Sequence, residues 1–152
     1  MDDSQRFLQI LQSHRELNKT FYQLLQSAAN LHGITPVQFI VLAHLARNPN
    51  IRLSDLAERM NLGNSTMSGI IDRMVKAELV SRERTEADRR AMTLNLTEKG
   101  LTLRQETEAT KIKFLQPLLQ LSERDQLEWH RIQQDIIRIL DQVREEVPHH
   151  NG

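Results

Sequence analysis

The sequence contains no cysteine, which excludes disulfide bonds, thiolate metal ligands, nucleophilic thiols and cysteine-based redox sensing. An excess of charge of either sign is also lacking, because 20 basic side chains balance 20 acidic ones. The net charge therefore gives no support for a nucleic-acid partner. Any argument for such a partner depends on where the charges lie.

Long apolar segments are absent as well. No stretch approaches the roughly 18 apolar residues of a membrane span, and the N-terminal MDDSQRF has acids where a signal peptide needs bases followed by an apolar core. We therefore expect a cytoplasmic protein with no membrane partner. The 152 residues, of which 39% are hydrophobic and 26% charged, suit a single folded domain.

The patterns of an enzyme are not found either. The six histidines show no HExxH spacing, and neither a glycine-flanked serine nor a phosphate-binding loop accompanies them. We therefore predict that the protein is not an enzyme and has no catalytic residues, cofactor or metal. His32 and His44 lie around the second expected helix and could line a ligand or metal site, although such histidines more often lie at the surface or are hydrogen-bonded within the fold.

Helical spacing dominates the first part of the chain. From residue 4 to about residue 31, apolar side chains recur every three or four positions, which predicts one long helix that ends before Gly33. The sequence Thr35-Pro36-Val37-Gln38 combines a capping hydroxyl, a proline at the first helical position and the glutamine of a capping box. A second helix is therefore expected to extend from there to Arg47.

Two shorter helices should follow. Asn48-Pro49-Asn50 predicts a turn, and Ile51 and Leu53 predict a very short strand. A helix of two turns is expected from Ser54 to about Asn61, followed by a turn at Leu62-Gly63-Asn64.

The fourth helix should begin at Asn64 or Ser65, either of which can cap it. Its spacing predicts a buried face made of Met67, Ile70, Ile71, Met74 and Val75. Its other face is small and polar, with Ser65, Thr66, Ser68, Gly69, Asp72, Arg73 and Lys76.

After Leu79 the pattern changes from helical spacing to alternation, which is typical of strands. Alternation over residues 80–84 and 92–96 predicts a hairpin with a charged tip between Thr85 and Arg90. The hairpin would carry four basic side chains, Arg82, Arg84, Arg89 and Arg90.

Two further helices complete the expected order of four helices, a hairpin and two helices. Thr97 can cap a long helix that extends to about Phe114 or Leu115, before Pro117 stops or kinks it. Ser122 can cap the last helix, which carries an apolar stripe.

Two short helices joined by a tight glycine-containing turn form the arrangement that places a helix in the major groove of DNA. Here the motif spans residues 53–76. Hydroxyl groups can bond phosphates or base edges, Gly69 permits close approach, and Arg73 can contact a phosphate or a guanine. Asp72 does not suit a phosphate, so it could accept from cytosine, pair with a neighbouring arginine or face solvent, and we favour the last two.

Helix-turn-helix pairs also occur in proteins where they have only a structural role. The hairpin that follows here favours the DNA-binding interpretation. Its arginines would form a basic arm beside the recognition helix, able to reach an adjacent groove or phosphates. The alternative is a solvated loop, since Glu83, Glu86 and Asp88 nearly balance the arginines. We favour the hypothesis that Asp88 pairs with one arginine and leaves another to reach DNA.

At these positions the sequence resembles the multiple-antibiotic-resistance-regulator (MarR) family of bacterial transcription factors. The matching residues are Leu53 to Met60 (LSDLAERM), Ser65 to Met74 (STMSGIIDRM), Glu78 to Arg82 (ELVSR), and Asp88-Arg89-Arg90 followed by Leu96 to Gly100 (LTEKG). The resemblance implies a winged-helix homodimer that binds a pseudo-palindromic operator, usually as a repressor. It also implies relief of repression by a small, often aromatic or anionic, effector bound between the dimerisation region and the DNA-binding lobe.

The resemblance places recognition-helix contacts at Ser65, Thr66, Ser68 and Arg73, and wing contacts at Asp88, Arg89 and Arg90. Together with the residue pattern, it gives the complete set of expected DNA-binding residues: Asn64, Ser65, Thr66, Ser68, Gly69, Arg73, Lys76, Arg82, Arg84, Asp88, Arg89 and Arg90. Val37, Ile40 and Leu101 could line an effector pocket, but core packing explains such residues equally well.

The expected fold is mainly α with a small β-hairpin wing, a winged helix-turn-helix flanked by N- and C-terminal dimerisation helices. We expect one MarR-type domain over residues 1–152, with a DNA-binding winged lobe at 35–100 and dimerisation helices at 4–31 and 101–146. The apolar stripes of the terminal helices independently favour a two-fold interface, because the small lobe cannot cover both.

Two recognition helices would then lie about 34 Å apart, which matches half-sites one turn of DNA apart. The alternatives are a monomer whose terminal helices pack on their own lobe, and a protein-binding adaptor that uses the winged fold without DNA.

Overall fold

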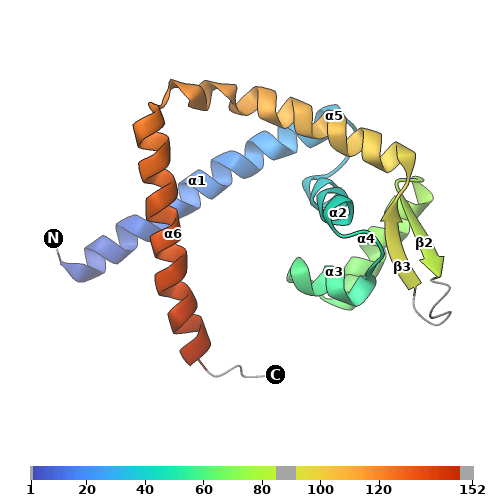
Figure 1. The fold of residues 1–152 in the computed structure, drawn as a ribbon, viewed down its shortest axis with the longest axis horizontal. Coiled ribbons are helices and arrows are strands. Elements are labelled where there is room, and N and C mark those ends of the chain that lie inside the picture. Colours follow the sequence, from blue (N-terminus) through green and yellow to red (C-terminus); the bar gives the residue numbers. More distant parts are fainter. Residues whose placement is uncertain (1, 85–91, 148–152) are drawn as a thin grey trace. The chain divides into compact units, whose positions relative to one another are not determined.

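The computed structural model describes residues 2–84 and 92–147, and the chain divides into two compact units, Met1–Phe114 and Leu115–Gly152 (Figure 1). The elements of the first unit are α1 (Asp3–Leu31), α2 (Pro36–Arg47), β1 (Ile51–Arg52), α3 (Leu53–Arg59), α4 (Asn64–Lys76), β2 (Val80–Arg84), β3 (Met92–Leu96) and α5 (Glu98–Leu115). The second unit contains the 3₁₀ turn η1 (Gln116–Gln120) and α6 (Glu123–Glu146). A mainly helical fold with a small β-hairpin is thereby confirmed.

The first two helices begin and end where local chemistry predicts. Gly33 adopts φ +73°, a left-handed conformation that favours glycine, and it ends α1. The hydroxyl of Thr35 accepts from the backbone N–H of Gln38 at 3.1 Å, and the Gln38 side chain accepts from the Thr35 N–H at 3.0 Å. This capping box begins α2 at Pro36, as the sequence predicts.

The short strand and the helix after it differ by one residue from the prediction. β1 is confined to Ile51 and Arg52, and Leu53 is the first residue of α3 rather than part of the strand. β1 pairs with β3, so that Ile51 lies opposite Leu94, and the hairpin becomes a three-stranded antiparallel sheet in the order β1-β3-β2. A strand of two residues carries no usable periodicity, and the sequence could not predict its partner.

The turn between α3 and α4 also differs from the prediction. α3 ends at Arg59 rather than near Asn61, and Asn61 takes the left-handed conformation with φ +53°. The cap of α4 is Gly63 rather than Asn64 or Ser65, and no side chain caps the helix. Gly63 has an ordinary φ of −68°, so the residue whose backbone conformation makes the turn is Asn61, an amino acid that tolerates this conformation.

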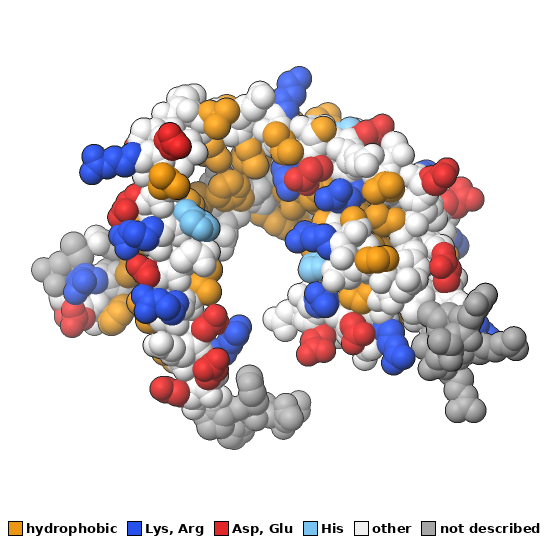
Figure 2. All heavy atoms as spheres, viewed as in Figure 1, with side chains coloured by type: hydrophobic (Ala, Val, Ile, Leu, Met, Phe, Trp, Pro, Cys, Tyr) orange, Lys and Arg blue, Asp and Glu red, His pale blue; other side chains and the backbone are white. Residues whose placement is uncertain are grey.

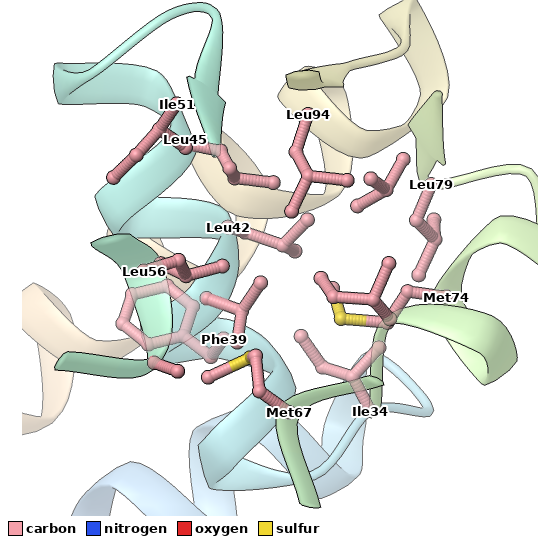
Figure 3. Close-up of a cluster of buried hydrophobic side chains, with 14 of the residues drawn as sticks. Ile34, Phe39, Leu42, Leu45, Ile51, Leu56, Met67, Met74, Leu79 and Leu94 are labelled. Atoms are coloured by element: carbon pink, nitrogen blue, oxygen red, sulfur yellow. The ribbon is translucent and has the colours of Figure 1, made fainter. Parts of the chain in front are cut away.

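A cluster of buried apolar side chains holds α2, α3, α4 and the sheet together, and Leu42, Leu56, Met67, Met74 and Leu94 point into it (Figure 3). On α4, Met67, Ile71 and Met74 are buried as predicted, whereas Ile70 and Val75 are only partly buried against the cluster. The core of the winged lobe also includes Ala29 of α1, and Leu103 of α5 packs against it.

The C-terminal end of α4 is joined closely to the beginning of α5. Glu78 has φ +60° and ends α4 in a turn in which the Leu79 N–H donates to the Met74 carbonyl at 2.9 Å. The Thr97 hydroxyl donates to the Glu78 carbonyl at 2.6 Å and accepts from the Gly100 N–H at 3.0 Å, which confirms Thr97 as the cap of α5. One hydroxyl thus links the end of one helix to the start of the next.

The predicted end of α5 and start of α6 hold. α5 ends at Leu115, and Pro117 lies in the 3₁₀ turn that follows. The Ser122 hydroxyl accepts from the Asp125 N–H at 3.1 Å and caps α6. Among the described helices, none is long and apolar enough to cross a membrane.

Candidate nucleic-acid interface

The outer face of α4 carries the small polar side chains that the sequence predicts. Asn64, Ser65 and Thr66 are exposed at the start of the helix, and Ser68 is partly buried one turn later. A Cβ built on Gly69 would meet no atom within 4 Å, so packing does not require glycine there. The absence of a side chain leaves the backbone open to close approach by a second molecule.

Two basic residues, Arg73 and Lys76, lie exposed in the last turns of α4. Within residues 2–84 and 92–147, neither forms an ion pair with an acidic side chain. Basic and acidic side chains are interspersed on the face of the molecule that Figure 2 shows. Attraction of an anionic partner would therefore depend on a few basic side chains on one helix, such as Arg73 and Lys76 on α4, and not on the overall charge of the protein.

Asp72, the residue on α4 that does not suit a phosphate, forms an ion pair with Arg82 of β2. The guanidinium Nη2 donates to the carboxylate Oδ1, and the Arg82 side chain is 33% exposed. Of the three possibilities for Asp72, the structure shows the pair with a neighbouring arginine. Arg82 is therefore engaged within the free protein, and its predicted contact with DNA stays a prediction.

The remaining wing residues fall into two groups. Arg84 is exposed at the last described position of β2, opposite Met92 of β3. Asp88, Arg89 and Arg90 lie outside the described residues. The hypothesis that Asp88 orients the wing by pairing with an arginine stays a prediction.

A polar network on the three-stranded sheet was missed by sequence reasoning. The Asn95 side-chain amide donates to Asn50 Oδ1 at 2.8 Å and to Glu83 Oε2 at 3.1 Å. The Asn95 side-chain oxygen Oδ1 accepts from the Asn50 backbone N–H at 2.8 Å. The network joins the turn before β1 to both strands of the hairpin and involves Glu83, which the sequence treats only as a balancing charge.

The arrangement of these elements agrees with comparisons to known proteins. Residues 34–92, from the start of the lobe to β3, match the MarR family model. Over this segment the chain is similar to the MarR family. A segment of 100 residues is 34% identical to the HTH-type transcriptional repressor MdtR of Bacillus subtilis and covers 66% of this chain and 61% of that protein. The match therefore spans less than two thirds of this relative's length.

Solved structures extend the likeness to nearly the whole chain. The MarR family transcriptional regulator AbsC of Streptomyces coelicolor superposes with a TM-score of 0.74 at 26% identity, covering 93% of this chain and 97% of that one. The MarR family transcription regulator SP03579 gives a TM-score of 0.85 at 18% identity, covering 95% and 97%. At that lower identity the likeness concerns the fold.

His32, at the end of α1, is hydrogen-bonded to α5. Its Nε2 lies 2.8 Å from the Thr110 hydroxyl, and its Nδ1 lies 3.9 Å from a carboxylate oxygen of Glu106. The described residues contain no group of three or more His, Asp or Glu side chains that could hold a metal ion.

A shallow pocket of about 570 Å³ lies between the end of α2 and α3. It is lined by Asn48, Pro49, Ile51, Asp55, Glu58 and Arg59. Val37, Ile40 and Leu101 do not line it, so the pocket does not support the sequence-based suggestion that they contact an effector.

His44 of α2 is expected to make the stability of the fold depend on pH in the acid range. Burial lowers the His44 pKa below its usual 6.5, and the guanidinium groups of Arg47 and Arg59 lower it further. Because the folded state favours the neutral ring, His44 stabilises the fold above pH 6.5 and loses that contribution as the pH falls through 6.5 to the folded pKa.

His44→Gln should therefore reduce the fall in the free energy of unfolding below pH 6.5, measured by urea denaturation at several pH values. His130→Gln, at an exposed position on α6, serves as the control. An identical pH dependence in His44→Gln and the unmodified protein would contradict the expectation.

Proposed function

We propose that this protein is a sequence-specific regulator of transcription that binds double-stranded DNA. The observation that carries the proposal is the outer face of α4, where exposed hydroxyl-bearing and small residues begin the helix and Arg73 and Lys76 end it. The N-terminal residues of such a helix contact base edges, and basic residues farther along contact phosphates. The expected contacts are Asn64, Ser65, Thr66, Ser68, Gly69, Arg73 and Lys76, with Arg84, Asp88, Arg89 and Arg90 from the wing.

We propose further that the protein acts as a homodimer. Six apolar side chains share one face of α6, and each is at least 40% exposed: Trp129, Ile132, Ile136, Ile139, Leu140 and Val143. On α1, Phe7, Ile10 and Leu11 are more than half exposed. Exposed apolar surface of this extent favours burial against a second copy. The winged lobe would be residues 35–100, and the dimerisation helices residues 4–31 and 101–146.

A dimer would present two copies of α4 to a pseudo-palindromic operator. The relative MdtR is named a transcriptional repressor, which supports repression as the sign of regulation. Release by a small aromatic or anionic effector completes the proposal.

The test is an affinity selection of genomic fragments with purified protein, followed by titration of the selected duplex across a salt series. The mass of the complex is measured in parallel. Enrichment of a pseudo-palindrome bound by two copies would support the proposal. A folded protein that selects no duplex would instead favour the winged-helix adaptor, and it would contradict DNA-binding regulation.

Arg73→Ala should weaken binding to the selected duplex by about five- to tenfold at moderate salt, because one phosphate contact is lost. The slope of log affinity against log salt should fall by about one. Lys19→Ala, which removes an exposed positive charge from α1, should leave the slope unchanged. Equal slopes for Arg73→Ala and the unmodified protein would show that Arg73 contacts no phosphate.

A further inference from the structure

The ion pair between Asp72 and Arg82 connects the recognition helix to the wing. Asp72 lies on the outer side of α4, and Arg82 lies at the middle of β2, ten residues later. The pair is partly exposed, with 59% of the Asp72 side chain and 33% of the Arg82 side chain accessible to solvent. An ordinary surface ion pair adds little to the free energy of unfolding. The importance of this pair therefore lies in the two elements that it connects.

The pair lies where the side chains of β2 become exposed, although Leu94 of β3, opposite Arg82, is buried. Val80, at the start of β2, is buried, whereas Arg82, Glu83 and Arg84 are exposed. The turn after α4 fixes the start of the strand, through the hydrogen bond from the Leu79 N–H to the Met74 carbonyl at 2.9 Å. Beyond Val80, β2 is held to the core only through its pairing with β3, and the contact from Arg82 to Asp72 ties its outer half directly to α4.

The polar network supports the hairpin through other groups. Glu83, the neighbour of Arg82, accepts from Ser81 and Asn95 at 3.1 Å. Adjacent residues of a strand point to opposite faces of the sheet. The hairpin is therefore held on one face by the network and on the other by the ion pair.

The charges also bear on the candidate interface. An unpaired carboxylate on the outer side of α4 would repel the phosphates that Arg73 and Lys76 attract. Pairing with Arg82 neutralises that carboxylate. It also withdraws one arginine from sequence-independent attraction to DNA.

We propose that Asp72 and Arg82 are positioning residues that set the placement of the wing relative to α4, and thereby the ability of both elements to contact one operator together. This inference rests on the proposed function. Loss of the pair lowers the preference for operator over unrelated DNA more than it lowers affinity for DNA in general.

The test compares Asp72→Asn, Arg82→Gln, the double variant and the exchanged variant D72R/R82D. The measurement is the ratio of dissociation constants for unrelated duplex and for the selected operator at one salt concentration. Each single variant should lower the ratio by about tenfold, the double variant should be no worse than either, and the exchange should recover part of the loss. Glu58→Gln, which neutralises an exposed carboxylate on α3, should leave the ratio unchanged.

A second measurement needs no DNA. Residual dipolar couplings of backbone amides in the free protein report the orientation of residues 82–84 and 92–93 relative to α4. Asp72→Asn should alter these couplings while leaving those within α4 unchanged. Unaltered couplings would overturn the positioning role whatever the protein does with DNA.

The outcomes separate the two proposals. Failure of the unmodified protein to bind any duplex would refute the proposed function, and the couplings would still decide the positioning role in the free protein. If Arg82→Gln weakened operator and unrelated duplex equally, and Asp72→Asn strengthened both equally, Arg82 would be a simple phosphate contact. That result would overturn the inference.

Discussion

Replacing Gly100 by alanine is expected to lower the free energy of unfolding by about 1–3 kcal/mol, the usual cost of forcing extra atoms into a packed site. A Cβ on Gly100 would lie 2.1 Å from the backbone carbonyl oxygen of Leu79. Backbone at that point cannot move freely, because the Leu79 N–H is bonded to Met74 and the Leu79 oxygen accepts from the Thr97 N–H at 3.2 Å. The substitution therefore separates α5 from the end of α4.

Thermal or urea denaturation measures this effect, and Gly69→Ala is the matched control. Both glycines lie in helices, where alanine is favoured by about 1 kcal/mol, but a Cβ on Gly69 meets no atom within 4 Å. The control should therefore be slightly stabilised. If Gly100→Ala were stabilised to the same extent, that result would contradict the close approach of α5 to the backbone of Leu79.

Ile136→Asp is expected to convert the proposed dimer to monomer and to weaken operator binding by at least about a hundredfold. Ile136 lies in the centre of the apolar face of α6, with Ile132, Ile139 and Leu140 one turn away on the same face. Burying a charge between apolar side chains of an interface costs several kcal/mol. No single contact between the two copies could offset that cost, so the dimer should dissociate. Sedimentation velocity measures the change in mass.

Ile137→Asp is the control, because it makes the same substitution at the next residue. Ile137 is about 100° around the helix from Ile136, and its neighbours one turn earlier are Gln133 and Gln134. It is 51% exposed, and an added charge there should leave the mass unchanged. A dimer that survived Ile136→Asp would place the interface elsewhere.

Local features of this fold could be predicted because their partners are close in sequence. The capping box of Thr35 and Gln38, the caps at Thr97 and Ser122, and the left-handed residue Gly33 all involve groups within five positions of one another. Helical spacing likewise identified the buried face of α4 around Met67 and Met74. The resemblance in residues 53–100 then connected these elements to a known family.

The candidate site was predictable to a different degree at each residue. The exposed position of Ser65 and Thr66 follows from helical periodicity once Met67 is assigned to the core. For Arg82, residue type suggested a DNA contact, but an arginine side chain binds phosphates and carboxylates equally well, so residue type alone could not identify its partner. Only the proximity of Asp72 shows which partner it has in the free protein.

The sequence by itself determined the helices, their caps, the hairpin and the small polar face of α4, since each depends on side-chain type and on spacing within one or two turns. The tertiary structure decided the pairing of Ile51 with Leu94, the network from Asn50 to Glu83, the Asp72–Arg82 pair and the approach of Gly100 to Leu79. These contacts join residues 10 to 45 positions apart. Their formation depends on how the core brings distant segments together, and no local periodicity encodes that distance.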